Sequence, residues 1–244
     1  SLFSCISVTG NAVFLSGDTA LQYQVSTGGA VGINSVKSSV YGSAAVKNAM
    51  ATLITQGRAN LLEDEYNRVT NRAVTSEAQI TQGLAGVPAT NAPFSSFPAN
   101  NPLADQLKMV ARLIAARSTL GASRQVFFVS IGGFDLHDNL LSQHSTLLGR
   151  VSDAMTAFYN ATAALGVADK VTAFTASDFG RTLSSNGDGS DHGWGSHHLL
   201  VGGAVKGAAF YGTPPPVSVG NTSAPEDQWH VGQGRLLPST SVDQ

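Results

Sequence analysis

The strongest constraint on the fold lies between residues 101 and 203, where amphipathic helices alternate with uninterrupted apolar strands. The first helix is predicted in "NPLADQLKMVARLIAARSTLG". Asn101 suits its N-cap, Pro102 its first helical position, and Gly121 the turn just past its end. One apolar stripe runs along it, made of Leu103, Leu107, Val110, Leu113 and Ile114. The strand "VFFVSI" is expected next, at 126–131.

The alternation then continues with a second helix and two more strands. The helix carries an apolar face of Leu148, Val151, Met155, Phe158 and Leu165. The strands are "VTAFTA" at 171–176 and, after a Gly-rich loop, "LLVGG" at 199–203. Helices alternating with apolar strands are typical of an α/β fold, so we expect a mostly parallel sheet flanked by helices.

The remaining residues precede this α/β core and divide into two zones. Residues 1–35 contain short strand-like segments with Gly and Ser turns, "SCISVTG", "AVFLSG", "YQVST" and "AVGI", and predict a small β region. Residues 36–100 predict a helical segment followed by a long loop rich in Pro, Ala and Asn. Residues 101–244 form the core that carries the candidate site, and we expect all three zones to belong to one structural domain.

The composition narrows the possible classes of function. Charged residues make up 12% of the chain, about half of the usual share of roughly 25%. With a net charge of −2 and no basic patch, nucleic acid is not an expected partner. No apolar run is long enough for a membrane-spanning helix. The single cysteine, Cys5, rules out an intrachain disulfide and is interpreted as a small core residue.

Side chains of the types that bind metals follow the first two strands of the core. Asp135, His137 and His144 lie in "GGFDLHDNLLSQH", directly after the first strand. Asp178 and Arg181 lie in "SDFGRT", directly after the second. In open α/β sheets, ligands bind beyond the carboxyl ends of the strands, which is where these residues are expected.

The loop before the third strand, "GSDHGWGSHH", adds Asp191, His192, His197 and His198. Five of the six histidines therefore fall between 137 and 198. Carboxylates combined with imidazoles suit Zn²⁺ and related divalent ions. The clustering predicts a metal or anion site where the loops converge.

Each residue also has an ordinary structural interpretation. Asp135 could cap the helix that follows it. His144 lies two helical turns beyond His137 and could stabilise the start of that helix instead of facing the site. Asp178 and Arg181 could form an ion pair that fixes a turn.

Several long motifs resemble one family. They are "FFVSIGGFDLHDN", "VTAFTASDFGRT", "NGDGSDHGWGSHHLLVGGAVKGAAFYG", "TSVDQ", "SVTGNAVFLSG" and "QLKMVARLIAARSTLG". Together they resemble the bacterial domain-of-unknown-function 1501 family, whose members are similar in core fold to the alkaline phosphatase and sulfatase superfamily. The resemblance implies an alkaline-phosphatase-like core that lacks its first strand. It also implies an internal fragment of a longer chain that is exported to the periplasm or the extracellular space.

The resemblance further implies a set of metal ligands. By position, Asp135 and His137 resemble ligands of a first ion, completed by one of His192, His197 and His198. Asp178 resembles a ligand of a second ion. The superfamily has a histidine directly after that aspartate, whereas this chain has Phe179 and so departs from the two-metal pattern.

The expected function is metal-dependent hydrolysis of a small phosphate or sulfate ester, with a divalent ion such as Zn²⁺. Arg181 is the candidate to hold the anionic oxygens and His144 a candidate catalytic histidine, while Asp191 is a further candidate ligand. The sequence contains no convincing nucleophile. The alternative is a non-catalytic secreted binding or structural protein with a degenerate site.

Overall fold

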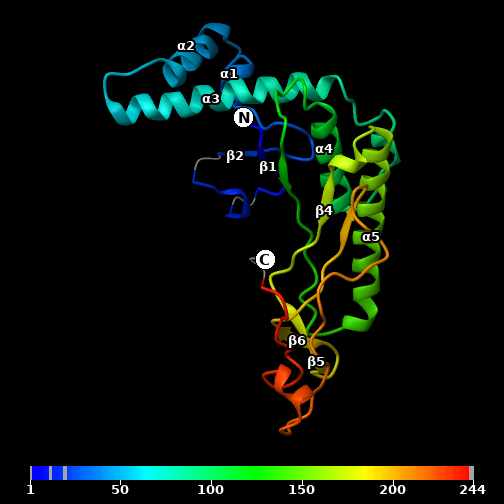
Figure 1. Ribbon diagram of the computed structural model, residues 1–244. Helices are drawn as coiled ribbons and strands as arrows, with labels where there is room; N and C mark the ends of the chain where they lie inside the picture. Colours follow the sequence, from blue (N-terminus) through cyan, green and yellow to red (C-terminus); the bar gives the residue numbers. More distant parts are fainter. Residues whose placement is uncertain (1, 11–12, 19–20, 242–244) are drawn as a thin grey trace. The chain divides into compact units, whose positions relative to one another are not determined.

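A computed structural model describes residues 2–10, 13–18 and 21–241 (Figure 1). The chain divides into two compact units, residues 1–130 and residues 131–244. In the described residues, no helix combines the length and the apolar character needed to cross a membrane.

The first unit contains a small parallel sheet of three strands in the order β2-β1-β3. The strands are β1 (Cys5–Ser7), β2 (Gln22–Gln24) and β3 (Val126–Phe128). The central strand β1 is the most enclosed, and Ile6 and Ser7 are completely buried. Parallel pairing is therefore present, but it joins β3, the first predicted strand of the core, to the strands of the N-terminal zone and not to the later core strands.

The segment "AVFLSG" does not form the strand that its apolar residues predict. Its described part contains a short 3₁₀ helix, η1 (Val13–Leu15), in which the Ser16 amide donates to the Val13 carbonyl. Only Leu15 is buried there, while Val13 and Phe14 are largely exposed. Three apolar residues in a row fit a single turn as well as a strand, so the pattern could not decide between them.

The described part of the first unit also contains four α-helices. They are α1 (Asn34–Lys37), α2 (Ala44–Thr55), α3 (Leu61–Ala85) and α4 (Pro102–Ala115), with the 3₁₀ helix η2 (Phe94–Ser96) in the long loop. The predicted start of α4 is confirmed: the Asn101 side chain accepts a hydrogen bond from the Ala104 amide at 3.3 Å, and Pro102 is the first helical residue. The predicted apolar stripe of α4 is buried throughout.

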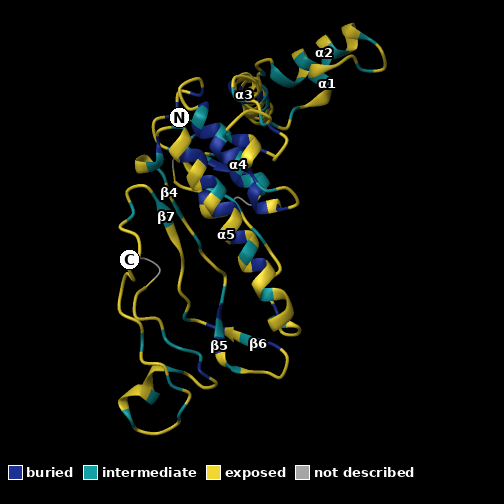
Figure 2. Ribbon diagram, turned by 90° about the vertical axis from the view of Figure 1, so that its right-hand side faces the viewer, coloured by how far each residue is buried: buried dark blue, intermediate teal, exposed yellow. Residues whose placement is uncertain are grey.

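The second unit contains α5 (Leu140–Ala164), the 3₁₀ helices η3 (Ala168–Lys170) and η4 (Pro225–Trp229), and the strands β4 (Thr172–Phe174), β5 (Gly180–Ser185), β6 (Ser190–Gly193) and β7 (Leu200–Gly202). Figure 2 shows buried and exposed residues alternating along α5. Its buried face includes Leu147, whereas the predicted Leu148 is about half exposed.

The single mostly parallel sheet expected for the core is not formed by the described residues. Instead, β4 pairs with β7 in an antiparallel sheet of two strands, and β5 pairs with β6 in an antiparallel hairpin. Parallel strands need a crossover connection, which is usually a helix. The chain between β4 and β7 carries the β5–β6 hairpin in place of a crossover helix, and β7 lies antiparallel beside β4. The protein is therefore a mixed α/β fold with a small parallel sheet flanked by helices.

Candidate metal centre

The β5–β6 hairpin sets Arg181 and His192 opposite each other. The two residues are partners in the antiparallel register, so their side chains leave the same face of the hairpin. The turn at 186–189 closes the hairpin through Asn186, whose side-chain oxygen accepts a hydrogen bond from the Gly189 amide at 2.9 Å. The sequence "NGDG" is typical of such a turn.

The loop at 132–139 lies directly against this hairpin. Its buried Leu136 accepts a hydrogen bond from the Ser190 amide, and the Leu140 amide donates to the Asp188 carbonyl. The Arg181 guanidinium joins both parts, because it donates to the carbonyls of Phe134 and Ser190. The main chain therefore fixes the loop and the hairpin relative to each other.

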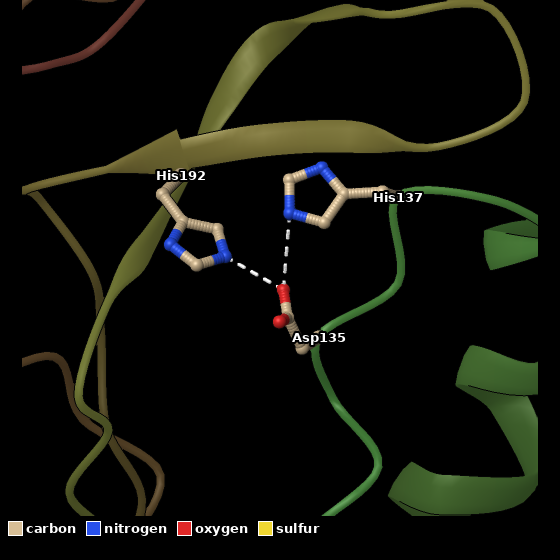
Figure 3. A group of neighbouring side chains, drawn as sticks. All are labelled: Asp135, His137 and His192. Atoms are coloured by element: carbon tan, nitrogen blue, oxygen red, sulfur yellow. Dashed lines mark hydrogen bonds and ion pairs between the residues drawn. The ribbon is translucent and has the colours of Figure 1, made fainter.

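This packing brings three side chains together around one carboxylate oxygen (Figure 3). Asp135 Oδ1 lies 2.6 Å from His192 Nε2 and 3.1 Å from His137 Nε2. The three donor atoms all lie within 4.8 Å of one another. Asp135 and His137 come from the loop, and His192 comes from β6.

Neighbouring side chains hold both imidazole rings. His137 Nδ1 lies 3.3 Å from Asp191 Oδ1. The His192 ring is stacked on the Phe179 ring, with centroids 3.8 Å apart and an interplanar angle of 2°. The Arg181 guanidinium lies 5.0 Å from the centre of the Phe179 ring.

The environment favours an ionised Asp135. The hydrogen bond from His192 lowers the pKa of the Asp135 carboxyl, and the charges of His192, His137 and Arg181 lower it further, against a smaller opposing effect of desolvation. The Asp135 side chain is 61% exposed, so the carboxylate is open to solvent. An ionised, accessible oxygen is a suitable ligand for a cation.

The residues fit a divalent ion of the zinc type. One carboxylate oxygen and two imidazole nitrogens are ligands that Zn²⁺ commonly takes, and three protein ligands with one open position are typical of catalytic zinc sites. Ligand atoms around a tetrahedral ion with bonds of about 2.0–2.1 Å lie roughly 3.3 Å apart. The distance between His137 Nε2 and Asp135 Oδ1 is already close to that value, while the shorter pair made by His192 must open slightly.

Residues 34–231 match the family described as "Protein of unknown function (DUF1501)". The chain belongs to the DUF1501 family. The match covers well over half of the 244 residues and includes both the loop at 132–139 and the β5–β6 hairpin. Comparison of the chain with curated proteins and with solved structures gave no match.

The DUF1501 chain brings together five of the predicted site residues: Asp135, His137, Arg181, Asp191 and His192. Among the described residues, Asp135, His137 and His192 are the one group of three whose donor atoms could share an ion. Asp135 does not cap the following helix, because the N-cap position of α5 belongs to Asn139. Arg181 pairs with Asp135, at 3.9 Å, in place of the ion pair with Asp178 that the sequence left open.

The other predicted site residues are not members of this group of ligands. Asp178 and His197 are exposed, and in the described part of the chain no ion pair joins either to the three ligands. His198 Nδ1 lies 3.4 Å from the Thr175 hydroxyl. His144 packs edge-to-face against Phe134, with ring centroids 6.1 Å apart. Among the residues that the structure describes, no second group of ligand atoms is found around Asp178.

Two contributors to the DUF1501 site have roles that the sequence did not reveal. Phe179 stood out only as a departure from the superfamily pattern, yet its ring supports His192. Asn186 lies in the turn between β5 and β6, and its side-chain nitrogen donates to Asp191 Oδ1 at 3.1 Å. The sequence signal that could have pointed to Asn186 is the Asn-Gly pair between the two strand segments, because such a pair predicts a tight hairpin turn.

Proposed function

We propose that this DUF1501 chain is a metal-dependent hydrolase of small phosphate or sulfate esters, built on an alkaline-phosphatase-like fold. Asp135, His137 and His192 are the proposed ligands of a divalent ion such as Zn²⁺. The observation that carries the proposal is the convergence of their three donor atoms at an exposed position.

The neighbouring residues have distinct proposed roles. Bound there, a divalent ion supplies Lewis acidity, which polarises an ester oxygen and activates a water molecule. Arg181 adds positive charge beside Asp135 and so favours an anionic substrate, while its hydrogen bonds to the Phe134 and Ser190 carbonyls keep it in place. His144, which packs edge-to-face against Phe134, is not part of this group and is assigned no role in the proposal.

The proposal is tested by metal analysis together with a panel of phosphate and sulfate esters. We expect the purified protein to contain or take up a divalent ion, and to turn over at least one ester class. Asp135→Asn should reduce both metal content and turnover, whereas Asp138→Asn, an exposed change in the same loop, should reduce neither. The hydrolase proposal would be refuted if the protein takes up no divalent ion and if its melting temperature does not change when a chelator is added.

A second function, binding without catalysis, is favoured by the positions of Asp178 and Arg181. Asp178 contributes nothing to the group of ligands, and two nitrogens of Arg181 are engaged by main-chain carbonyls. Under this alternative, a secreted binding or structural protein retains only part of a catalytic site. Metal uptake that depends on Asp135, without turnover of any ester in the panel, would select it.

A further inference from the structure

We propose that Asp191 is the positioning carboxylate of this metal centre. It accepts the Nδ1 proton of His137 and thereby leaves the Nε2 lone pair of that ring for the ion. The inference rests on the proposed function, and it assigns Asp191 a place outside the ligand set in which the sequence had put it.

The two nitrogens of His137 face two different carboxylates. Nε2 lies 3.1 Å from Asp135 Oδ1, and Nδ1 lies 3.3 Å from Asp191 Oδ1. Figure 3 shows the second nitrogen of the ring directed away from Asp135. A neutral imidazole has one proton, so one nitrogen donates and the other presents a lone pair.

Metal binding decides which nitrogen keeps the proton. The nitrogen that faces the ligand group must be bare to bind an ion, so the proton has to reside on Nδ1. Histidine ligands in proteins almost always donate this second N–H to a carboxylate, a carbonyl or water. Asp191 Oδ1 lies 3.3 Å from Nδ1 as an ion-pair contact, and it is the carboxylate that this nitrogen faces.

The surroundings of Asp191 agree with a positioning role. Successive residues of β6 point in different directions, so Asp191 meets the outer nitrogen of His137 while His192 meets Asp135. Its Oδ1 also accepts a hydrogen bond from Asn186 at 3.1 Å. Asn186 in turn accepts from the Gly189 amide, so the hairpin turn itself orients the carboxylate.

The test measures Zn²⁺ affinity by competition with a chelating dye. We expect Asp191→Ala to weaken binding by about 10- to 100-fold, the usual effect of losing the outer partner of a histidine ligand. Asp135→Ala should weaken it more, because that change removes a ligand. Asp191→Glu should recover part of the affinity, and Asp188→Ala, an exposed change in the same turn, should leave it unchanged.

A double-mutant cycle separates a positioning role from a general structural one. If Asp191 acts through His137, Asp191→Ala should have no further effect on Zn²⁺ affinity in a His137→Ala background. A direct ligand or a residue that only supports the hairpin would weaken binding equally in both backgrounds, and that result would overturn the inference. Nitrogen-15 NMR of the Zn²⁺-loaded protein should show the His137 proton on Nδ1, and a proton on Nε2 would overturn it as well.

The failures of the two proposals are distinguishable. A wild-type protein that binds no divalent ion, Zn²⁺ included, overturns both. Zn²⁺ binding without ester turnover overturns only the hydrolase. Zn²⁺ binding that is insensitive to Asp191→Ala overturns only the positioning role.

Discussion

The backbone carbonyl of His137 occupies the space that a Cβ atom would fill at Gly189. The loop that carries two of the proposed ligands therefore rests directly on the turn of the hairpin that carries the third. Only glycine permits this approach, because any side chain at position 189 would meet main-chain atoms that cannot rotate away.

We predict that Gly189→Ala separates the loop from the hairpin. Overpacking against a main chain typically costs about 1–3 kcal/mol, and here it would also displace His137 from His192. The expected result is a lower free energy of unfolding and weaker Zn²⁺ binding, measured by urea denaturation and dye competition. Gly132→Ala is the matched control, since a Cβ there meets nothing within 4 Å. Equal behaviour of the two variants would contradict the role of the contact.

Phe179 is predicted to hold His192 in its binding orientation. Aromatic pairs contribute about 0.5–1.5 kcal/mol beyond the area that they bury, so Phe179→Leu should weaken Zn²⁺ binding by roughly two- to tenfold. Phe179→Tyr should keep the stacking and the affinity. Phe174→Leu serves as the control, because Phe174 is 72% exposed. An unchanged affinity in Phe179→Leu would show that the ring does not orient the histidine.

The sequence predicted the elements whose signals are local. The start of α4 was readable from Asn101 and Pro102, since a cap and a first-turn proline act on the adjacent residues. The residues that meet at the centre, Asp135, His137 and His192, were also among those singled out, because ligand-type side chains followed strand-like segments.

The pairing of the strands was not predictable in the same way. An apolar run predicts that a strand is buried, but it does not predict which strand pairs with it or whether the two strands run parallel or antiparallel. The pattern of apolar residues indicated neither the antiparallel pairing of β4 with β7 nor the hairpin that lies between them in the sequence.

The ion pair between Lys37 and Glu77 should make the first unit sensitive to acid. Lys37 Nζ lies 2.5 Å from Glu77 Oε1, and the Glu77 side chain is only 7% exposed. The hydrogen bond from Lys37, followed by that from Thr81, lowers the pKa of the Glu77 carboxyl. Glu77→Gln should destabilise the protein by about 1–2 kcal/mol at neutral pH. The expected loss is smaller than for a fully buried charged hydrogen bond, because Lys37 is half exposed and solvent screens its charge.

The pH dependence follows from the direction of that pKa shift. The stabilisation by Glu77 is complete above the pKa of an unfolded glutamate, about 4.3, and is lost as the pH falls through the lower pKa of the folded state. Urea denaturation of wild type and Glu77→Gln should therefore converge in strong acid. The exposed pair of Glu65 with Arg68 provides the contrast, and Glu65→Gln should change the free energy of unfolding by no more than about 0.5 kcal/mol. A difference between wild type and Glu77→Gln that persists unchanged in acid would rule out the ion pair as its source.

Asp227 organises the loop between β7 and the C-terminal residues of the structure. Its carboxylate accepts hydrogen bonds from the Ser218 hydroxyl, the Thr222 hydroxyl and the Thr222 amide, and the bond from Ser218 is the main cause of its lowered pKa. It also fills the space that a Cβ would take at Gly220.

We predict that Asp227→Ala opens this loop locally without unfolding the rest of the second unit. Loss of the acceptor should speed hydrogen exchange of the Thr222 amide by about two- to tenfold, in line with the net effect of single hydrogen bonds. The amides of α5 should keep their exchange rates, because no hydrogen bond found in the described residues joins Asp227 to that helix. Glu226→Gln, at the exposed neighbouring position, is the matched control. If Thr222 exchanges equally fast in Asp227→Ala and in wild type, the carboxylate is not what closes the loop.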